Sequence, residues 1–163
     1  MENLPPLSSH MEDYLEAIYF ILQNEPEAHA AKIAERLGVR RASVTGALRI
    51  LADKSLINYQ PYKGITLTEE GRKQGEAVAK RHRILQSFIR DILGMEEKEA
   101  EEIACKMEHI TNPDFMGRMV QFITFFEKCE DVRLTWNKLG KVHCGKPGES
   151  ENCQTCLQFT GNL

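Results

Sequence analysis

The sequence of 163 residues lacks any long apolar run. No stretch reaches the roughly 18 consecutive apolar residues that a membrane-spanning helix needs. The N-terminal segment also lacks a basic start followed by an uninterrupted apolar stretch, because acidic residues interrupt it. No signal peptide is therefore expected. We expect a cytoplasmic protein with no membrane partner.

The chain also lacks an excess of positive charge. It has 21 Lys and Arg against 24 Asp and Glu, a net charge of −3, which excludes a uniformly basic, histone-like protein. The charge is unevenly distributed, because residues 26–63 carry +4 and leave −7 for the remainder. A basic segment on an acidic body is typical of a DNA-binding domain joined to another domain.

Motifs of hydrolytic enzymes are absent as well. The sequence contains neither an H-E-x-x-H zinc-protease motif nor a G-x-S-x-G nucleophile motif. A metalloenzyme built on His82, Glu108 and His109 would leave the basic segment without a role. We therefore expect a protein that is not an enzyme.

Apolar spacing predicts three helices at the start of the chain. Residues 10–22 carry apolar side chains at intervals of three and four, and residues 28–37 form a shorter helical pattern. Gly38 follows the second pattern in the usual position after a helix. A third helix opens around residues 39–46, and its buried stripe is Val44, Leu48 and Leu51. Helix, glycine turn and helix together indicate a helix-turn-helix.

The period then changes to that of strands. Residues 56–60 and 65–68 are predicted as two strands joined by a turn at 61–64, which makes a β-hairpin wing. Thr68 is the expected N-cap of a long helix that ends at Gly94. Further helices are predicted at residues 96–110 and 113–128, and an irregular segment from Gly140 onward. The expected fold is mainly α, with an N-terminal winged helix-turn-helix followed by an all-helical domain.

In a helix-turn-helix the N-terminal residues of the second helix contact base edges in the major groove. Arginine pairs with guanine, and hydroxyl groups contact bases or phosphates. A basic helix without a nucleic-acid role and a winged helix that binds protein are the alternatives. The candidate DNA-binding residues are Arg40, Arg41, Ser43, Thr45 and Gly46 on this helix and Lys63 at the hairpin tip.

Side chains suited to metal binding occur in three places. Asp13 and Glu16 are three residues apart on the first predicted helix, so they share a face. His82 lies on the long predicted helix. Acidic residues of an amphipathic helix are usually solvent-facing, and a lone histidine is often only hydrogen-bonded. These three residues alone therefore leave both interpretations open.

The third place is a C-x-x-E-H motif. Cys105, Glu108 and His109 lie at positions i, i+3 and i+4, so they share one helical face. A thiolate, a carboxylate and an imidazole together suit a transition metal. The alternative is that Cys105, beside apolar Ile103 and Ala104, is a core residue.

With these motifs in view, the sequence resembles the diphtheria-toxin-repressor and manganese-transport-regulator family of metal-dependent repressors. The resemblance extends from about residue 11 to residue 126, and order, spacing and winged-helix context all match. The segments that carry it are MEDYLEAIY at 11–19, IAERL at 33–37, LTEEG at 67–71, KRHR at 80–83 and ACKMEH at 104–109.

The resemblance implies a homodimer that binds Fe(II) or Mn(II) and then a palindromic operator in double-stranded DNA, as a repressor of iron or manganese uptake genes. It implies a winged-helix DNA-binding domain at 1–70, a helical metal-binding and dimerisation domain at 71–139, and a cysteine-containing tail at 140–163. Longer members carry an additional SH3-like domain, and this chain is expected to be a short form without it. The implied metal ligands are Asp13, Glu16, His82, Cys105, Glu108 and His109.

The implied ligand set is mixed. Asp13 resembles the manganese branch of the family, whereas Cys105 resembles the iron branch. Gln86 and Glu101 stand where the iron branch has the Glu and His of an ancillary site, so that site is not carried over. A thiolate shifts preference from Mn(II) toward Fe(II), Co(II) or Zn(II), and we expect Fe(II) ahead of Mn(II).

The tail contains Cys144, Cys153 and Cys156, with Cys129 or His143 as a fourth ligand. A C-x-x-C pair chelates zinc or an iron–sulfur cluster. A tail of free thiols and a redox-switched disulfide are the alternatives. An alternative function follows, namely a winged-helix regulator that senses redox or iron–sulfur status through these cysteines.

Overall fold

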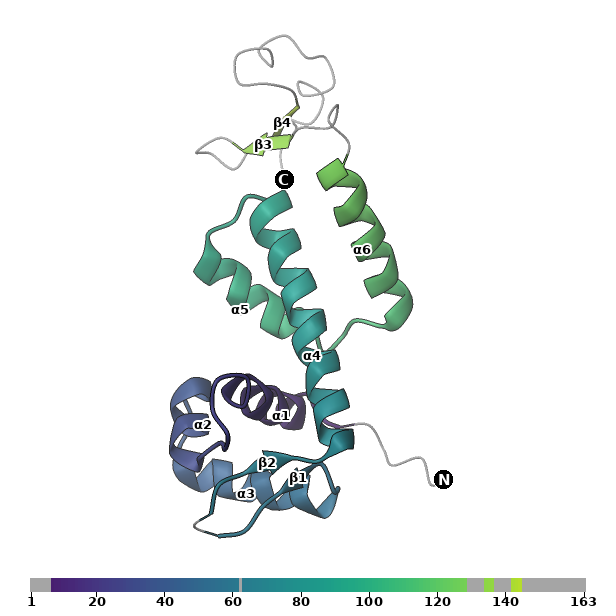
Figure 1. Ribbon diagram of the computed structural model, residues 1–163. Coiled ribbons are helices and arrows are strands. Elements are labelled where there is room, and N and C mark those ends of the chain that lie inside the picture. Colours follow the sequence, from purple (N-terminus) through teal and green to yellow (C-terminus); the bar gives the residue numbers. More distant parts are fainter. Residues whose placement is uncertain (1–6, 62, 129–133, 137–141, 145–163) are drawn as a thin grey trace. The chain divides into compact units, whose positions relative to one another are not determined.

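The computed structural model describes residues 7–61, 63–128, 134–136 and 142–144 (Figure 1). The chain divides into two compact units, Met1–Arg81 and His82–Leu163. The fold is mainly helical, as predicted. The predicted domains at 1–70, 71–139 and 140–163 divide the chain by function and stay a prediction.

Three helices form the core of the first unit: α1 (Ser9–Ile21), α2 (Ala30–Leu37) and α3 (Arg41–Asp53). Each packs against the other two (Figure 1). Their predicted apolar stripes point inward, and Leu15, Ile18, Ile33 and Leu48 are fully buried. Gly38 ends α2 with φ of 64°, a left-handed conformation that favours glycine. The helix-turn-helix is therefore confirmed.

The wing is an antiparallel pair of strands, β1 (Ile57–Asn58) and β2 (Thr66–Leu67). Ile57 pairs with Leu67 and Asn58 with Thr66. Both strands are shorter than predicted. Ile65 instead exchanges backbone hydrogen bonds of 2.9 and 2.8 Å with Ala28, which attaches the wing to the segment before α2.

Helix α4 (Glu69–Ser87) follows the wing and continues as η1 (Phe88–Ile92), a π-helical turn. Thr68 is its N-cap, as predicted, because its hydroxyl accepts a 3.0 Å hydrogen bond from the Gly71 amide. Gly94, with φ of 68°, follows the end of η1. Apolar spacing predicted one regular helix here and did not reveal the π-helical turn.

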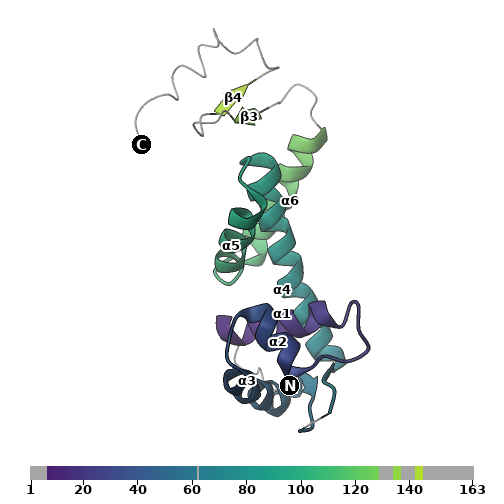
Figure 2. The same cartoon turned by 90° about the vertical axis from the view of Figure 1, so that its left-hand side faces the viewer.

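In the second unit, α5 (Glu97–Met107) and α6 (Pro113–Lys128) both contact η1 (Figure 2). The Phe88 and Phe122 rings meet edge to face, with centroids 6.1 Å apart. The Asn112 side chain accepts a 2.8 Å hydrogen bond from the Phe115 amide and caps α6. The buried residues of this core are Leu85, Ile89, Ala100, Ala104 and Met116.

A second antiparallel pair joins β3 (Leu134–Trp136) to β4 (Val142–Cys144). The prediction of an irregular segment from Gly140 onward is therefore wrong for Val142–Cys144. Strand pairing depends on a partner segment, which a local pattern does not reveal. Cys129, Cys153 and Cys156 and the side chains of His143 and Cys144 lie outside what the structure describes.

Within the described residues, no helix is both long and apolar enough to cross a membrane.

Candidate metal centre and nucleic-acid interface

The Glu108 carboxylate lies between two imidazole rings of the second unit. Its Oε2 is 2.7 Å from Nδ1 of His82, and its Oε1 is 3.5 Å from Nε2 of His109. Glu108 is fully buried and His82 is 5 % exposed. A buried carboxylate is costly unless it is paired or binds a metal, so this arrangement is not that of a solvated acidic residue.

Cys105 belongs to the same cluster. One donor atom each from Cys105, Glu108 and His109 lies within 4.8 Å of the others. Sulfur, oxygen and nitrogen donors at this separation fit a transition-metal ion, whose ligands lie about 2.0–2.3 Å from it. Four of the six predicted ligands therefore gather in the second unit, since His82 contacts Glu108 directly.

The end of α5 arranges these side chains. The helix ends at Met107, three residues before the predicted end, but Glu108 keeps helical angles and its amide donates to Ala104 O at 3.0 Å. The Thr111 hydroxyl donates to Glu108 O at 3.0 Å. Cys105 and Glu108 thus remain one turn apart, as the predicted spacing requires.

The other two predicted ligands belong to the first unit. Asp13 and Glu16 lie one turn apart on α1, and both are half-buried. Asp13 Oδ2 is 3.8 Å from His10 Nδ1. Their participation in the metal centre stays a prediction.

Glu101 makes a contact that the sequence interpretation missed. Its Oε2 is 3.3 Å from Nε2 of His82 and accepts a 2.7 Å hydrogen bond from Gln86 Nε2. The sequence argument set both residues aside because they did not match an ancillary site. The signal was present, however, since Glu101, Cys105 and Glu108 recur at helical spacing on α5.

A surface pair at the π-helical turn, Arg90 and Asp91, has shifted pKa values. The hydrogen bond from the Arg90 guanidinium lowers the pKa of Asp91. Hydrogen bonds to Asp91 and Glu97 raise the pKa of Arg90. This pair stabilises charges at the surface and does not belong to the donor cluster.

In the first unit, a basic hollow lies between α3 and the wing. Arg41, Arg49 and Lys63 line it together with His29 and Tyr59. Thr45 also lines it, although its hydroxyl donates to Arg41 O at 3.2 Å within the helix. Three of the predicted DNA-binding residues therefore share this hollow. Of the other three, Arg40 and Ser43 are exposed at the start of α3, and Gly46 is exposed further along the helix.

Sequence reasoning did not select Arg49, His29 and Tyr59 as DNA-binding residues. Arg49 lies on α3 one and two turns after Thr45 and Arg41, so helical spacing could have indicated it. Tyr59 comes from the wing, and its position depends on the fold. Cationic side chains such as those lining this hollow are the groups that contact phosphate in protein–DNA complexes.

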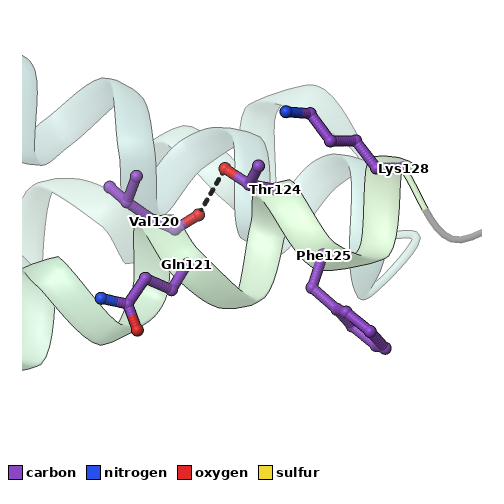
Figure 3. Close-up of a pocket in the computed structure, with 5 residues that line it drawn as sticks. All are labelled: Val120, Gln121, Thr124, Phe125 and Lys128. Atoms are coloured by element: carbon purple, nitrogen blue, oxygen red, sulfur yellow. Dashed lines mark hydrogen bonds between the residues drawn. The ribbon is translucent and has the colours of Figure 1, made fainter.

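Helix α6 presents large apolar side chains to solvent. Phe115, Phe122 and Phe125 are 39, 47 and 58 % exposed. Val120, Thr124 and Phe125 are among the residues that line a shallow hollow on α6, and Figure 3 shows the Phe125 ring projecting away from the helix. Exposed aromatic side chains in one region are typical of a protein interface.

Two family models match successive parts of the chain. The "iron dependent repressor, N-terminal DNA binding domain" matches residues 6–65. The "iron dependent repressor, metal binding and dimerisation domain" matches residues 68–137. The first contains α1–α3 and strand β1 of the wing, and the second contains the donor cluster.

Curated relatives agree with this assignment. The chain is 35% identical over 122 residues to an uncharacterised HTH-type transcriptional regulator of Methanocaldococcus jannaschii, covering 74% of this chain and 98% of that protein. It is 32% identical over 121 residues to the HTH-type transcriptional regulator MntR of Bacillus pumilus, covering 74% and 83%.

Solved structures show the same fold. A manganese-dependent transcriptional repressor in complex with manganese is similar with a TM-score of 0.65 and 25% identity, over 85% of this chain and 63% of that one. The manganese regulator SloR is similar with a TM-score of 0.64 and 25% identity, over 74% and 56%. The chain thus spans somewhat more than half of these solved chains. It belongs to the iron-dependent repressor family, whose members are metal-dependent, DNA-binding transcriptional regulators and not enzymes.

Proposed function

We propose that this protein is a repressor activated by Fe(II) or Mn(II) that acts on iron or manganese uptake genes in the cytoplasm. The observation that carries the proposal is the buried Glu108 carboxylate between His82 and His109, with Cys105 beside it. Binding of a divalent cation would compensate the buried negative charge and use three kinds of donor atom.

The proposed ligand set adds Asp13 and Glu16 of α1 to this cluster. Their carboxylates are hard oxygen donors, which suit Mn(II) and Fe(II). The Cys105 thiolate is the softest donor and favours Fe(II) over Mn(II). Zn(II) stands above both in intrinsic affinity, so the metal that acts in the cell also depends on availability.

A mechanism follows from the distribution of these ligands between two units. Asp13 and Glu16 belong to the unit that carries α3, and the other ligands belong to the second unit. A metal bound by both sets selects one arrangement of the units. It activates DNA binding only by the difference in its affinity for the competent and incompetent arrangements.

The basic hollow supports DNA as the partner. Arg41, Arg49 and Lys63 provide three cations at the end of the wing and along α3, where a winged helix meets the duplex. We propose that Arg40, Arg41 and Ser43 contact bases or phosphates at the start of α3, and that Lys63 contacts phosphate.

The exposed face of α6 supports a homodimer. Phe115, Phe122 and Phe125 would be covered by a second copy of the chain, in agreement with the family's dimerisation domain. A two-fold dimer carries two winged helices related by symmetry, and we propose that it binds a palindromic operator for this reason.

The test is anaerobic selection of random duplex DNA by the purified protein with Fe(II), with Mn(II) or with a chelator. We expect one palindrome to be enriched only when metal is present. Asp13→Ala and His109→Ala should remain folded dimers whose DNA affinity no longer rises with metal, because each lacks one ligand. Metal-dependent enrichment that persists in both variants would falsify the proposed ligand set.

The same experiment separates the second candidate function. We propose as this alternative that Cys144, Cys153 and Cys156 bind zinc or an iron–sulfur cluster and transmit the signal. Their C-x8-C-x2-C spacing supports it. Enrichment that survives chelation but is lost in a Cys153→Ser, Cys156→Ser double variant would favour the tail over the donor cluster.

A further inference from the structure

His82 is held at both ring nitrogens by carboxylates. Nδ1 faces Glu108 Oε2 at 2.7 Å, and Nε2 faces Glu101 Oε2 at 3.3 Å. Glu108 is fully buried, whereas the Glu101 side chain is 53 % exposed. Nδ1 of the ring therefore faces the buried Glu108 of the donor cluster, and Nε2 faces the partly exposed Glu101.

Glu101 is itself held in place. Gln86, one turn after His82 on α4, donates from Nε2 to Glu101 Oε2 at 2.7 Å. The same amide nitrogen donates to Glu97 Oε1 at 2.8 Å. Glu97 in turn accepts a 3.1 Å hydrogen bond from Arg90. Gln86 and Arg90 thus connect the α4–η1 segment to the first two turns of α5.

An imidazole that binds a metal through one nitrogen carries its proton on the other, where a hydrogen-bond acceptor fixes it. In the metal-loaded state Glu108 and Nδ1 of His82 would both face the ion, so the ring proton would face Glu101. A carboxylate at Nε2 stabilises the tautomer protonated at Nε2. That tautomer leaves the Nδ1 lone pair directed toward Glu108, which is a proposed metal ligand. Such outer carboxylates also raise the basicity of the ligating imidazole.

We infer that Glu101 is a positioning residue that accepts the Nε2 proton of His82 and so reserves Nδ1 for the metal, with Gln86 holding the Glu101 carboxylate in place. This inference rests on the proposed function, because it requires His82 to be a metal ligand. Glu101 acts through His82 and contacts no metal itself.

The experiment uses the full chain with Zn(II), a diamagnetic probe, and compares Glu101→Ala with Glu97→Ala. Both variants remove an α5 carboxylate that accepts from Gln86, but only Glu101 contacts His82. We expect Zn(II) affinity in calorimetry to fall about 10–100-fold in Glu101→Ala. Glu97→Ala should stay within about twofold of the wild type, because exposed charge pairs contribute little.

Two further measurements separate positioning from a structural effect. Long-range 15N–1H spectra of the Zn(II)-loaded wild type should show His82 protonated at Nε2 and bound to metal through Nδ1. Glu101→Gln keeps an acceptor oxygen without the charge, so its affinity should lie between those of the wild type and Glu101→Ala. A metal bound at Nε2 would overturn the inference, since Glu101 would then occupy the metal's side of the ring.

The failure of this inference is distinguishable from failure of the proposed function. If His82→Ala loses Zn(II) affinity while Glu101→Ala matches Glu97→Ala, the role of Glu101 is wrong and the metal centre stands. If His82→Ala binds Zn(II) like the wild type, His82 is no ligand, and both the ligand set and the inference are overturned.

Discussion

At the scale of single residues, Cys105 is the proposed ligand that we expect to set which metals the donor cluster prefers. It lies with Glu108 and His109 in a group whose donor atoms are within 4.8 Å of one another. The other proposed donors are carboxylates and imidazoles, which Mn(II), Fe(II) and Zn(II) all accept. The thiolate is the one soft donor of this set, so its removal should change relative affinities more than the fold.

We predict that Cys105→Ser lowers the affinity for Zn(II) and Co(II) on the order of 100-fold and lowers that for Mn(II) much less, because a hydroxyl replaces a thiolate that prefers softer ions. Competition titrations with a chromophoric chelator under anaerobic conditions measure these affinities. The Co(II) form of the wild type should also show a thiolate charge-transfer absorption that the variant lacks. Equal losses for all three ions would contradict the assigned role.

The proximity of residues within one segment was the part of the candidate site that the sequence predicted most directly. Cys105, Glu108 and His109 are close in the sequence, so helical spacing alone placed them together. The Glu101–His82 contact joins α5 to α4, and no local pattern determines such a contact. The Glu101–His82 contact can be predicted only when the packing of α5 against the α4–η1 segment is known.

At the scale of elements, the start of α4 depends on a close approach to the wing. The Thr68 hydroxyl accepts from the Gly71 amide and donates to Ser55 O at 2.8 Å. A Cβ atom at Gly71 would overlap the carbonyl oxygen of Leu56. Glycine is therefore required at this position by contact with the backbone and not by its own φ angle.

We predict that Gly71→Ala destabilises the first unit by about 1–3 kcal/mol, because the methyl group forces the helix away from Leu56. Gly46→Ala is the matched control, since nothing lies within 4 Å of a Cβ atom there in the middle of α3. It should stabilise the protein by about 0.5–1 kcal/mol through helix propensity. Urea unfolding followed by circular dichroism measures the free energy of unfolding of both variants. If Gly71→Ala leaves this free energy unchanged, the wing can move to make room for the methyl group and the prediction is wrong.

The elements themselves were predictable where their signals were local. The spacing of Val44, Leu48 and Leu51, the glycine after α2 and the Thr68 cap all reappear in the structure. The wing strands were predicted but are shorter than expected, and the π-helical turn Phe88–Ile92 and the β3–β4 pair were not predictable in this way. They depend on partners distant in sequence or on packing against α5 and α6.

At the scale of the whole molecule, the exposed aromatic face of α6 is the surface that assembly would bury. Phe122 contacts Phe88 and Phe126 within the unit and is still 47 % exposed. Phe125 is 58 % exposed. Aromatic side chains that become fully covered dominate the energy of an interface.

We predict that Phe125→Glu weakens dimerisation by at least about 30-fold, because a charge replaces an apolar group worth about 2 kcal/mol when covered. Sedimentation velocity over a range of concentrations measures the monomer–dimer equilibrium. Ile50→Glu places the same charge at a comparably exposed apolar residue of α3, which is 45 % exposed. Ile50→Glu should remain a dimer. If both substitutions weaken dimerisation equally, the effect of Phe125→Glu is not specific to α6, and the assignment of the interface to α6 is wrong.

The continuity of α4 has a consequence for how the molecule unfolds. The division between the two units falls between Arg81 and His82, inside a helix that extends without interruption from Glu69 to Ser87. Buried Ala79 packs in the core of the first unit, and buried Leu85 packs in the core of the second. Melting of either unit leaves the other with a frayed helix end and fewer backbone hydrogen bonds. The two units therefore share part of their folding cooperativity, and the amide protons around residue 82 exchange with solvent only as fast as this common stretch opens.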